Sequence, residues 1–186
     1  MSKTDFSDIN IPELIADMWE PLTKEQQEYL SDHFTIQNFK KNEVVHFEGE
    51  TPTHLMCLLT GKVKIYKEGV GGRSQIIRMM KPVEYFGYRA YFSEQAYVTA
   101  AAAFEPSVIC LIPMTVITHL IRQNNDLAMF FIKQLSNDLG LSDTRTVNLT
   151  QKHIRGRLAE SLLFLKESYG IEEDGSTLSI YLSRED

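Results

Sequence analysis

The sequence has little cysteine: Cys57 and Cys110 are the two thiols in a chain of 186 residues. Two thiols cannot build a four-cysteine zinc site within one chain, and the same count excludes an iron–sulfur cluster held by four thiolates. A disulfide scaffold is not expected at this chain length. Each cysteine lies in a short apolar run, so we predict that both are buried core thiols.

Basic charge is also scarce. The chain has 19 Lys and Arg residues against 25 Asp and Glu residues, which gives a formal net charge of −6. Because the chain has no general attraction to nucleic acid, any DNA contact must come from a local patch or from a part outside this chain. The apolar runs are far shorter than the ~20 residues that cross a bilayer, and the first residues are polar. We therefore expect a cytoplasmic protein with no membrane partner.

Enzyme motifs are missing as well. The sequence contains no His-x-His pair, Gly-x-Ser-x-Gly elbow or Walker loop. The histidines are scattered, which disfavours a cupin-type metal enzyme; they are His33, His46, His54, His119 and His153. We predict that the protein is not an enzyme and has no catalytic residue and no metal site. Haem stays open as an alternative, because His46, His54, His119 and Met79 are available as ligands.

The spacing of apolar residues divides the chain into four segments. We expect N-terminal helices in 1–38, a β-rich domain in 39–113, a linker helix and a long helix in 114–150, and the start of a further domain in 151–186. The first segment predicts a short helix over Ile11–Trp19. A capping box at Thr23–Gln26 predicts the start of a second helix, which runs to about Phe34.

Residues 39–113 have the short, turn-separated apolar runs that are typical of β-structure. Lys62–Lys67 alternates between apolar and polar residues, and Gly69–Gly72 predicts a hairpin tip from which Gln75–Met80 returns. A last strand pair is expected at Thr99–Phe104 and Val108–Ile112. Many short antiparallel strands predict a compact barrel or roll. The fold class is therefore mainly β plus α: a double-stranded β-helix, of jelly-roll or β-roll type, followed by helices.

A proline-free segment from Asp126 to about Thr150 predicts one long helix, preceded by a short helix at Thr115–Arg122. Its stripe recurs at the spacing of a seam between helices; the members are Leu127, Phe131, Leu135, Leu139, Ser142, Thr146 and Leu149. We expect this seam to pair two copies into a parallel homodimer. The alternative is a helix that packs along its own barrel.

The last segment begins with another amphipathic helix from His153, and Leu178, Ile180 and Leu182 then alternate as a strand. Ser183 and Asp186 have the spacing of a helix cap. A cap with no helix after it predicts that the chain stops at the start of a further module, and a frayed terminus is the alternative. The basic residues that begin the helix could approach a DNA backbone or form a solvated face; they are Lys152, His153, Arg155 and Arg157.

Five short motifs, in this order of elements, resemble the Crp/Fnr family of bacterial transcription regulators. The motifs are Phe47–Glu50, Gly61–Tyr66, Tyr85–Gly87 with Tyr91-Phe92, Gly156–Leu163 and Leu182–Asp186. The resemblance covers roughly Leu22 to Asp186. It implies a homodimer in which the roll senses a signal, the long helices pair, and a C-terminal winged helix-turn-helix binds a palindromic DNA site beside RNA polymerase.

The same resemblance places Ser183 and Arg184 at the start of the first helix of the DNA-binding motif, where they could contact phosphate. The base-reading residues are missing from this chain, so we expect the chain alone to bind DNA weakly or not at all. The predicted function is a dimeric transcription regulator of Crp/Fnr type. The alternative is a ligand-binding regulatory module with the same roll and no role on DNA.

Family members that bind cyclic nucleotides have a Gly-Glu-Leu motif followed by Arg-Ser or Arg-Thr. Here Tyr88 stands in place of the Glu, the position of the Arg falls near Tyr97–Val98, and Val83 stands in place of a family glycine. Arg89 could supply a cation, but it is expected to share a strand with Tyr88, so only one of the two side chains would face inward.

Cyclic AMP is therefore not the expected ligand, and no cofactor is certain. Ser142 and Asp143 would approach the pocket from the long helix, and Asp143 adds unfavourable negative charge. The pocket either holds another small ligand or is filled by its own side chains. The candidate pocket residues are Gly87, Tyr88, Arg89, Tyr97, Val98, Ser142 and Asp143.

Overall fold

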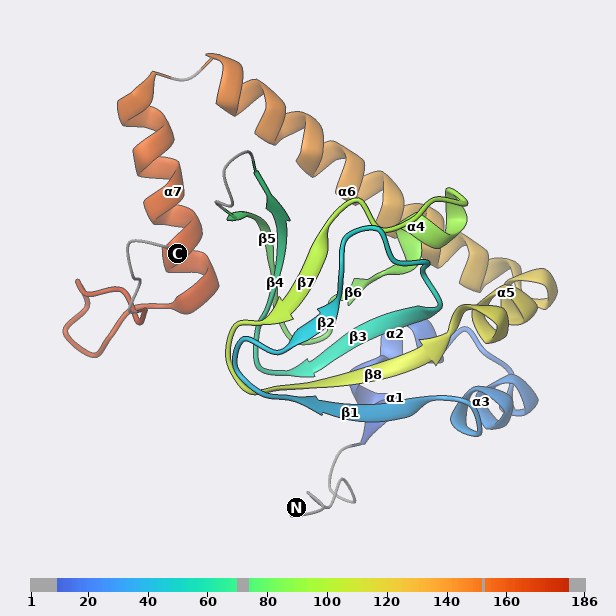
Figure 1. The fold of residues 1–186 in the computed structure, drawn as a ribbon. Helices are drawn as coiled ribbons and strands as arrows, with labels where there is room; N and C mark the ends of the chain where they lie inside the picture. Colours follow the sequence, from blue (N-terminus) through green and yellow to red (C-terminus); the bar gives the residue numbers. More distant parts are fainter. Residues whose placement is uncertain (1–9, 70–73, 152, 181–186) are drawn as a thin grey trace. The chain divides into compact units, whose positions relative to one another are not determined.

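The computed structural model describes residues 10–69, 74–151 and 153–180 (Figure 1). The helices are α1 Ile11–Leu14, α2 Ala16–Trp19, α3 Lys24–Ser31, α4 Tyr88–Phe92, α5 Met114–Gln123, α6 Asn125–Gln151 and α7 Ile154–Tyr169. The strands are β1 Thr35–Phe39, β2 Val44–His46, β3 His54–Thr60, β4 Val63–Glu68, β5 Ser74–Met80, β6 Tyr85–Phe86, β7 Ala100–Ala103 and β8 Ser107–Pro113. The chain forms two units, residues 1–67 with 76–132 and residues 68–75 with 133–186.

The strands form two four-stranded sheets, as expected for a roll. One sheet has the order β1-β8-β3-β6 and the other the order β2-β7-β4-β5. The roll begins earlier than the apolar pattern indicates, because β1 runs antiparallel to β8 from Thr35 onward. The prediction that β7 and β8 pair with each other is wrong. β7 pairs with β2 and β4, whereas β8 pairs with β1 and β3, so the turn between them carries the chain from one sheet to the other.

The core of the roll lies between these sheets. Its buried members come from both sheets and from the segment after β6; they are Phe39, Met56, Leu58, Val63, Met80, Phe86, Ala90, Tyr97, Ala101, Ala103 and Ile109. All residues of β7 are buried alanines, and these small side chains let this strand pack closely. Cys57 and Cys110 are buried, free thiols opposite each other on β3 and β8, which confirms that both are core residues.

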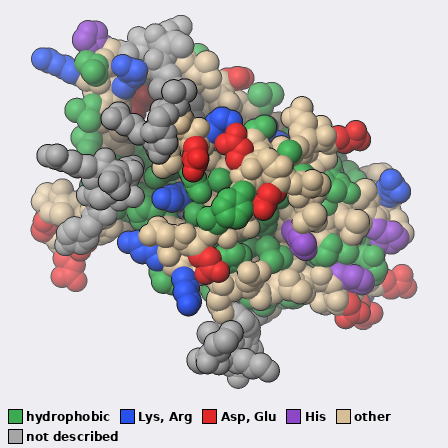
Figure 2. All heavy atoms as spheres, in the orientation of Figure 1, with side chains coloured by type: hydrophobic (Ala, Val, Ile, Leu, Met, Phe, Trp, Pro, Cys, Tyr) green, Lys and Arg blue, Asp and Glu red, His purple; other side chains and the backbone are tan. Residues whose placement is uncertain are grey.

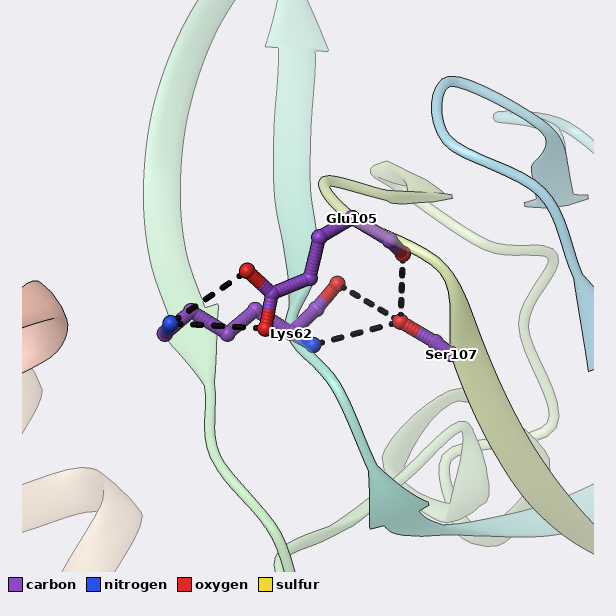
Figure 3. Close-up of polar contacts among 3 residues, drawn as sticks. All are labelled: Lys62, Glu105 and Ser107. Carbon is purple, nitrogen blue, oxygen red and sulfur yellow. Dashed lines mark hydrogen bonds and ion pairs between the residues drawn. The ribbon is translucent and has the colours of Figure 1, made fainter. Parts of the chain in front are cut away.

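A turn at Gly61 is locked to the β7–β8 corner by Ser107, a buried polar residue (Figure 3). The Ser107 hydroxyl accepts a hydrogen bond from the Lys62 amide at 3.2 Å. It also lies 3.0 and 2.7 Å from the carbonyl oxygens of Lys62 and Glu105. The Lys62 ammonium pairs with the Glu105 carboxylate at 3.3 Å, so the same two segments are joined on the outside as well.

The N-terminal helices are joined to the roll through α2. The helix expected over Ile11–Trp19 is divided at Ile15 into α1 and α2. The Tyr85 hydroxyl donates to the Asp17 carboxylate at 2.8 Å and so ties α2 to β6. The capping box is confirmed: the Thr23 side chain accepts from the Gln26 amide, and the Gln26 side chain accepts from the Thr23 amide. It starts α3, which ends at Ser31.

The predicted long helix is confirmed as α6, a continuous helix of 27 residues. The strand predicted over Leu178–Leu182 can be followed only to Ile180: Leu178 makes an isolated bridge with Ile171 and the chain bends at Ser179, while Leu182 lies outside the described residues. Within the same residues, none of the helices combines the length and the apolar character needed to cross a membrane.

Candidate functional site

The roll contains a cavity of about 230 Å³ between its two sheets. Its lining comes from β1, β2, β3 and β8, the turn before β2 and the loops that follow β2 and α4; the residues are Gln37, Phe39, Glu43, Val44, Val45, His46, Glu50, Thr51, Thr53, His54, Met56, Tyr97 and Leu111. Phe39 and Met56 form a buried floor, whereas Glu43 and Glu50 are exposed at the mouth. The cavity therefore combines buried apolar residues with polar residues and two exposed carboxylates.

His46 and Tyr97 are neighbours in the lining of this cavity. Their rings stack with centroids 3.8 Å apart and an interplanar angle of 24°. Two backbone hydrogen bonds position this pair: the Gly49 amide donates to the Tyr97 carbonyl at 2.8 Å, and the Tyr97 amide donates to the Glu50 carbonyl at 2.9 Å. The loop after β2 and the segment before β7 are thereby held side by side.

Both side chains carry a buried polar atom with no partner. His46 is 6% exposed and Tyr97 is 7% exposed. Neither His46 Nδ1 nor Tyr97 Oη has a hydrogen-bond partner within the part of the chain that the structure describes. A buried polar atom without a partner costs about 1–3 kcal/mol.

Burial controls the protonation of the pair. It lowers the pKa of His46 to about 4, although the Phe47 backbone and the Glu50 charge act in the opposite direction. Burial also raises the pKa of Tyr97 to about 12, and the Glu50 charge adds to this effect. At neutral pH the cavity therefore presents a neutral imidazole and a neutral phenol, each able to donate and to accept a hydrogen bond.

The structure brings together part of the predicted pocket. A Cβ atom placed on Gly87 would lie 3.3 Å from Tyr97 Oη and 2.9 Å from the His54 carbonyl oxygen, so these residues are neighbours. Val83 has a φ of +69°, so this β-branched residue adopts the left-handed backbone conformation that glycine adopts most easily. The turn at Val83 therefore has the left-handed backbone conformation that a glycine would adopt, although the residue is valine.

Tyr88 lies elsewhere. It starts α4, so the expectation that Tyr88 and Arg89 alternate along a strand is wrong. The Tyr88 ring packs with its centroid 5.4 Å from that of Phe131, while the neighbouring Arg89 is exposed. Tyr88 therefore belongs to an aromatic cluster at the start of α6 and does not line the cavity.

In family members that bind cyclic nucleotides, an arginine follows the Gly-Glu-Leu motif. Its matched position here, Tyr97–Val98, has no cationic side chain. Val98 is exposed, and its carbonyl oxygen accepts a hydrogen bond from the Lys67 ammonium at 3.0 Å. Lys67 also pairs with Glu48 at 2.7 Å, so a carboxylate already neutralises this cation. Sequence reasoning missed Lys67, because nothing in the spacing along the chain relates β4 to these two loops.

Ser142 and Asp143 are exposed residues of the second unit, on α6. At the start of the same helix, Leu127 is 0% and Phe131 is 3% exposed, because both are buried by other residues of the same chain. Their assignment to a seam between copies is therefore corrected. Leu139 is 63% exposed, and Leu135 is half-buried.

Several predicted contacts fall elsewhere or cannot be placed. Ser183, Arg184 and the side chain of Leu149 lie outside the described residues. Of the haem-ligand candidates, His46 and His54 line the cavity, Met79 is buried, and His119 is exposed beside Tyr29. In residues 10–69, 74–151 and 153–180, no three His, Cys, Asp or Glu side chains are grouped so that they could hold a metal ion.

Comparison with known proteins identifies this architecture. Residues 36–124 match the cyclic nucleotide-binding domain. An uncharacterized protein of Haemophilus influenzae is 30% identical over 109 residues, which cover 58% of this chain and 84% of that protein. The Global nitrogen regulator of a Nostoc species is 23% identical over 155 residues, which cover 81% of this chain and 69% of that regulator.

The fold agrees with these matches. The crystal structure of the sensor domain of the transcriptional regulator DNR from Pseudomonas aeruginosa has a TM-score of 0.63 and 24% identity, covering 72% of this chain and 91% of that one. The chain spans about two thirds of the length of the curated regulators that it matches. The chain thus belongs to the cyclic nucleotide-binding domain family, and its homologues are regulators of the Crp/Fnr family.

Proposed function

We propose that the chain is the sensor and dimerisation part of a DNA-binding transcription regulator of Crp/Fnr type. In this proposal the roll holds a small-molecule signal, two copies pair through α6, and a C-terminal winged helix-turn-helix contacts DNA and RNA polymerase in the cytoplasm. The observation that carries the proposal is α6 itself. Its first turns are anchored on the roll through Leu127 and Phe131, and it continues to Gln151 with exposed apolar side chains.

The exposed side chains of α6 support a dimer seam that differs from the predicted one in its first two members: Ala128 and Ile132 replace Leu127 and Phe131. With Leu127 and Phe131 committed to the roll, a stripe of alternating four- and three-residue steps begins at Ala128 and joins the predicted stripe at Leu135. Its members are Ala128, Ile132, Leu135, Leu139, Ser142, Thr146 and Leu149. Ile132 is 52% exposed and Leu139 is 63% exposed, which is unusual for large apolar residues on one helix.

The polar members of this stripe fit a helix contact. The Thr146 hydroxyl donates to the Ser142 carbonyl oxygen of its own helix at 3.0 Å. Its methyl group can then pack against a partner without leaving the hydroxyl unsatisfied.

Leu139→Glu is expected to weaken the dimer at least tenfold, because a carboxylate in the middle of an apolar seam must be desolvated opposite its own copy. Sedimentation velocity over a range of concentrations measures this change. The matched control is Asn137→Glu, which adds the same charge at an exposed position outside the stripe. Equal weakening by both variants, or a wild-type chain that stays monomeric at high concentration, contradicts the proposed dimer.

Pairing through α6 explains how a signal in the roll could reach DNA. A ligand that binds one arrangement of the two long helices better than another shifts the population toward it. Two recognition helices must lie ~34 Å apart to enter successive major grooves, so a small rotation at the seam is enough to change DNA binding.

The role on DNA is tested in the cell that encodes the chain. Immunoprecipitation of the gene product and sequencing of the DNA bound to it is expected to return sites with two-fold symmetry. If no DNA is enriched, the role on DNA is excluded and the chain is a regulatory module that binds a ligand. That alternative is less well supported, because the relatives that match over most of this chain are named as regulators, whereas a cGMP-dependent protein kinase of Toxoplasma gondii matches over only 50% of it.

Cyclic AMP is not the proposed signal. A cyclic phosphate needs cationic donors, ideally a forked arginine. Near the matched position the chain has Val98 and a Lys67 that is already paired with Glu48.

A further inference from the structure

We infer that a groove between the end of α4 and α5 binds a free α-amino acid with a large apolar side chain. In this site Arg122 and Tyr91 hold the carboxylate of the ligand, and Glu94 holds its ammonium group. The inference rests on the proposed sensor function and names the chemical class of its signal. The groove shares only Thr51 with the lining of the cavity at His46, and it is not the place of the family's Gly-Glu-Leu motif.

The groove is accessible and large enough for such a ligand. Its lining comes from the loop after β2, from the end of α4 with the loop that follows, and from α5. All of these residues belong to the first unit of the chain. Ligand pockets have volumes of about 300–1,000 Å³, and this groove has about 610 Å³. Phe92, Glu94, Gln95 and Arg122 are exposed, so a ligand reaches them without any opening of the fold.

Two hydrogen-bond donors lie together on the α5 side of the groove. The Tyr91 hydroxyl is 3.4 Å from the Thr118 hydroxyl. The single proton of the Thr118 hydroxyl is donated to the Met114 carbonyl oxygen at 2.7 Å, so the Tyr91 proton has only the long contact to Thr118. Arg122 follows Thr118 by four residues and therefore lies on the same face of α5. A guanidinium beside a phenol hydroxyl is a suitable donor set for a carboxylate.

Glu94 provides the opposite charge. Among the described residues of the lining, Glu94 is the one acidic side chain and Arg122 the one basic side chain. Two backbone hydrogen bonds of 3.0 Å fix the loop that carries Glu94: its amide donates to the Tyr91 carbonyl, and the Gln95 amide donates to the Ala90 carbonyl. No ion pair joins Glu94 and Arg122 in the part of the chain that the structure describes, so both charges are available to a ligand.

The two charges favour a ligand that carries both signs. A ligand with one charge would pair with one of these side chains and face the like charge of the other. The chain as a whole also has a formal net charge of −6, and Figure 2 shows acidic side chains over the roll on the face that it displays. This field repels a simple anion, whereas a zwitterion has no net charge. An α-amino acid has its ammonium and carboxylate groups on one carbon atom and so fits this requirement.

Phe92 supplies an apolar surface for the side chain of the ligand. It is 38% exposed, although it is a large aromatic residue. Its ring is held in place by neighbouring rings, with centroids 5.6 Å from that of Phe131 and 6.0 Å from that of Tyr91. A further aromatic ring can pack against the exposed part of Phe92. An amino acid with an aromatic side chain is therefore the suitable probe.

The test compares three probes that share a phenyl ring. They are L-phenylalanine, 3-phenylpropionate, which lacks the ammonium group, and 2-phenylethylammonium, which lacks the carboxylate. Each is titrated into the isotopically labelled chain, and the backbone amide resonances are followed by NMR. We expect saturable shifts along 91–96 and 118–122 with L-phenylalanine, and at least fivefold weaker binding of either analogue. Equal binding of the three probes, or no saturable shift with L-phenylalanine, overturns the inference.

Two variants assign the charged groups to the ligand. Arg122→Gln is expected to weaken L-phenylalanine at least fivefold without weakening 2-phenylethylammonium, which has no carboxylate to lose. Glu94→Gln is expected to weaken L-phenylalanine at least fivefold without weakening 3-phenylpropionate. The matched control is Arg89→Gln, which removes an exposed arginine of α4 outside the lining and should keep the wild-type affinity. Equal weakening by Arg89→Gln and Arg122→Gln contradicts the site.

Sedimentation of the same samples separates this inference from the proposed function. A chain that dimerises without binding L-phenylalanine retains the proposed function and loses only the amino-acid site. A chain that binds L-phenylalanine and stays monomeric retains the site and loses the proposed dimer.

Discussion

Gly61→Ala is expected to lower the free energy of unfolding by on the order of 3 kcal/mol, from backbone strain together with a steric clash. Gly61 has a φ of +87°, where an L side chain is strained. A Cβ at this position would lie 2.5 Å from the Pro106 carbonyl oxygen and 2.8 Å from Ser107 Cα. Both are backbone atoms, so rotation of a side chain cannot relieve the overlap. The turn and the β7–β8 corner would have to separate, which breaks the hydrogen bonds of Ser107 (Figure 3).

Urea denaturation followed by circular dichroism measures this loss. Gly49→Ala is the matched control, since Gly49 also has a φ of +87° but no atom lies within 4 Å of its added Cβ. The control retains the conformational strain and has no clash, so it should lose only about 1–2 kcal/mol. Equal losses at the two glycines would show that crowding at the Ser107 corner is unimportant.

Acid is expected to destabilise the fold through His46 by about 3 kcal/mol between neutral pH and pH 4. The pKa of His46 is lowered from 6.5 to about 4 in the folded chain because burial disfavours the imidazolium. Between these two values the unfolded chain binds a proton that the folded chain does not. The free energy of unfolding therefore falls as the pH falls from 6.5 toward 4, and the contribution of His46 becomes constant below that.

Other titratable groups lie near His46, so its effect on the free energy of unfolding must be measured as a difference between variants. Glu43, Glu50, His54 and Tyr97 share the cavity, and Glu50 favours the imidazolium. Other groups also titrate over this range, so the quantity to compare is the difference between wild type and His46→Phe, which keeps a ring against Tyr97 without a titrating group. Denaturation curves at pH 7 and pH 4.5 give this difference. His119→Phe, at an exposed histidine, should keep the wild-type slope, and a wild-type slope in His46→Phe would contradict the role of His46.

Sequence reasoning located only part of the candidate site. Gly87 and Tyr97 came from a family motif, and the structure places them side by side. His46 was considered only as a possible metal or haem ligand, although it stacks directly on Tyr97. The signal available beforehand was weak: a histidine in an otherwise apolar short strand, followed by Glu48-Gly49-Glu50. These residues come together with Tyr97 only because the backbone of Gly49 and Glu50 is hydrogen-bonded to the backbone of Tyr97.

The features that the sequence determined by itself are those in which every interacting group lies within a few turns or one hairpin. The capping box at Thr23 and Gln26, the strand β4 and the uninterrupted helix α6 all depend on neighbours along the chain. The tertiary structure alone decided which strands pair across the roll, that Tyr88 lies in a helix, and which side of α6 meets the roll. A helix exposes several adjacent apolar stripes, and the choice between Leu127 with Phe131 and Ala128 with Ile132 depends on which stripe the aromatic cluster of α4 buries.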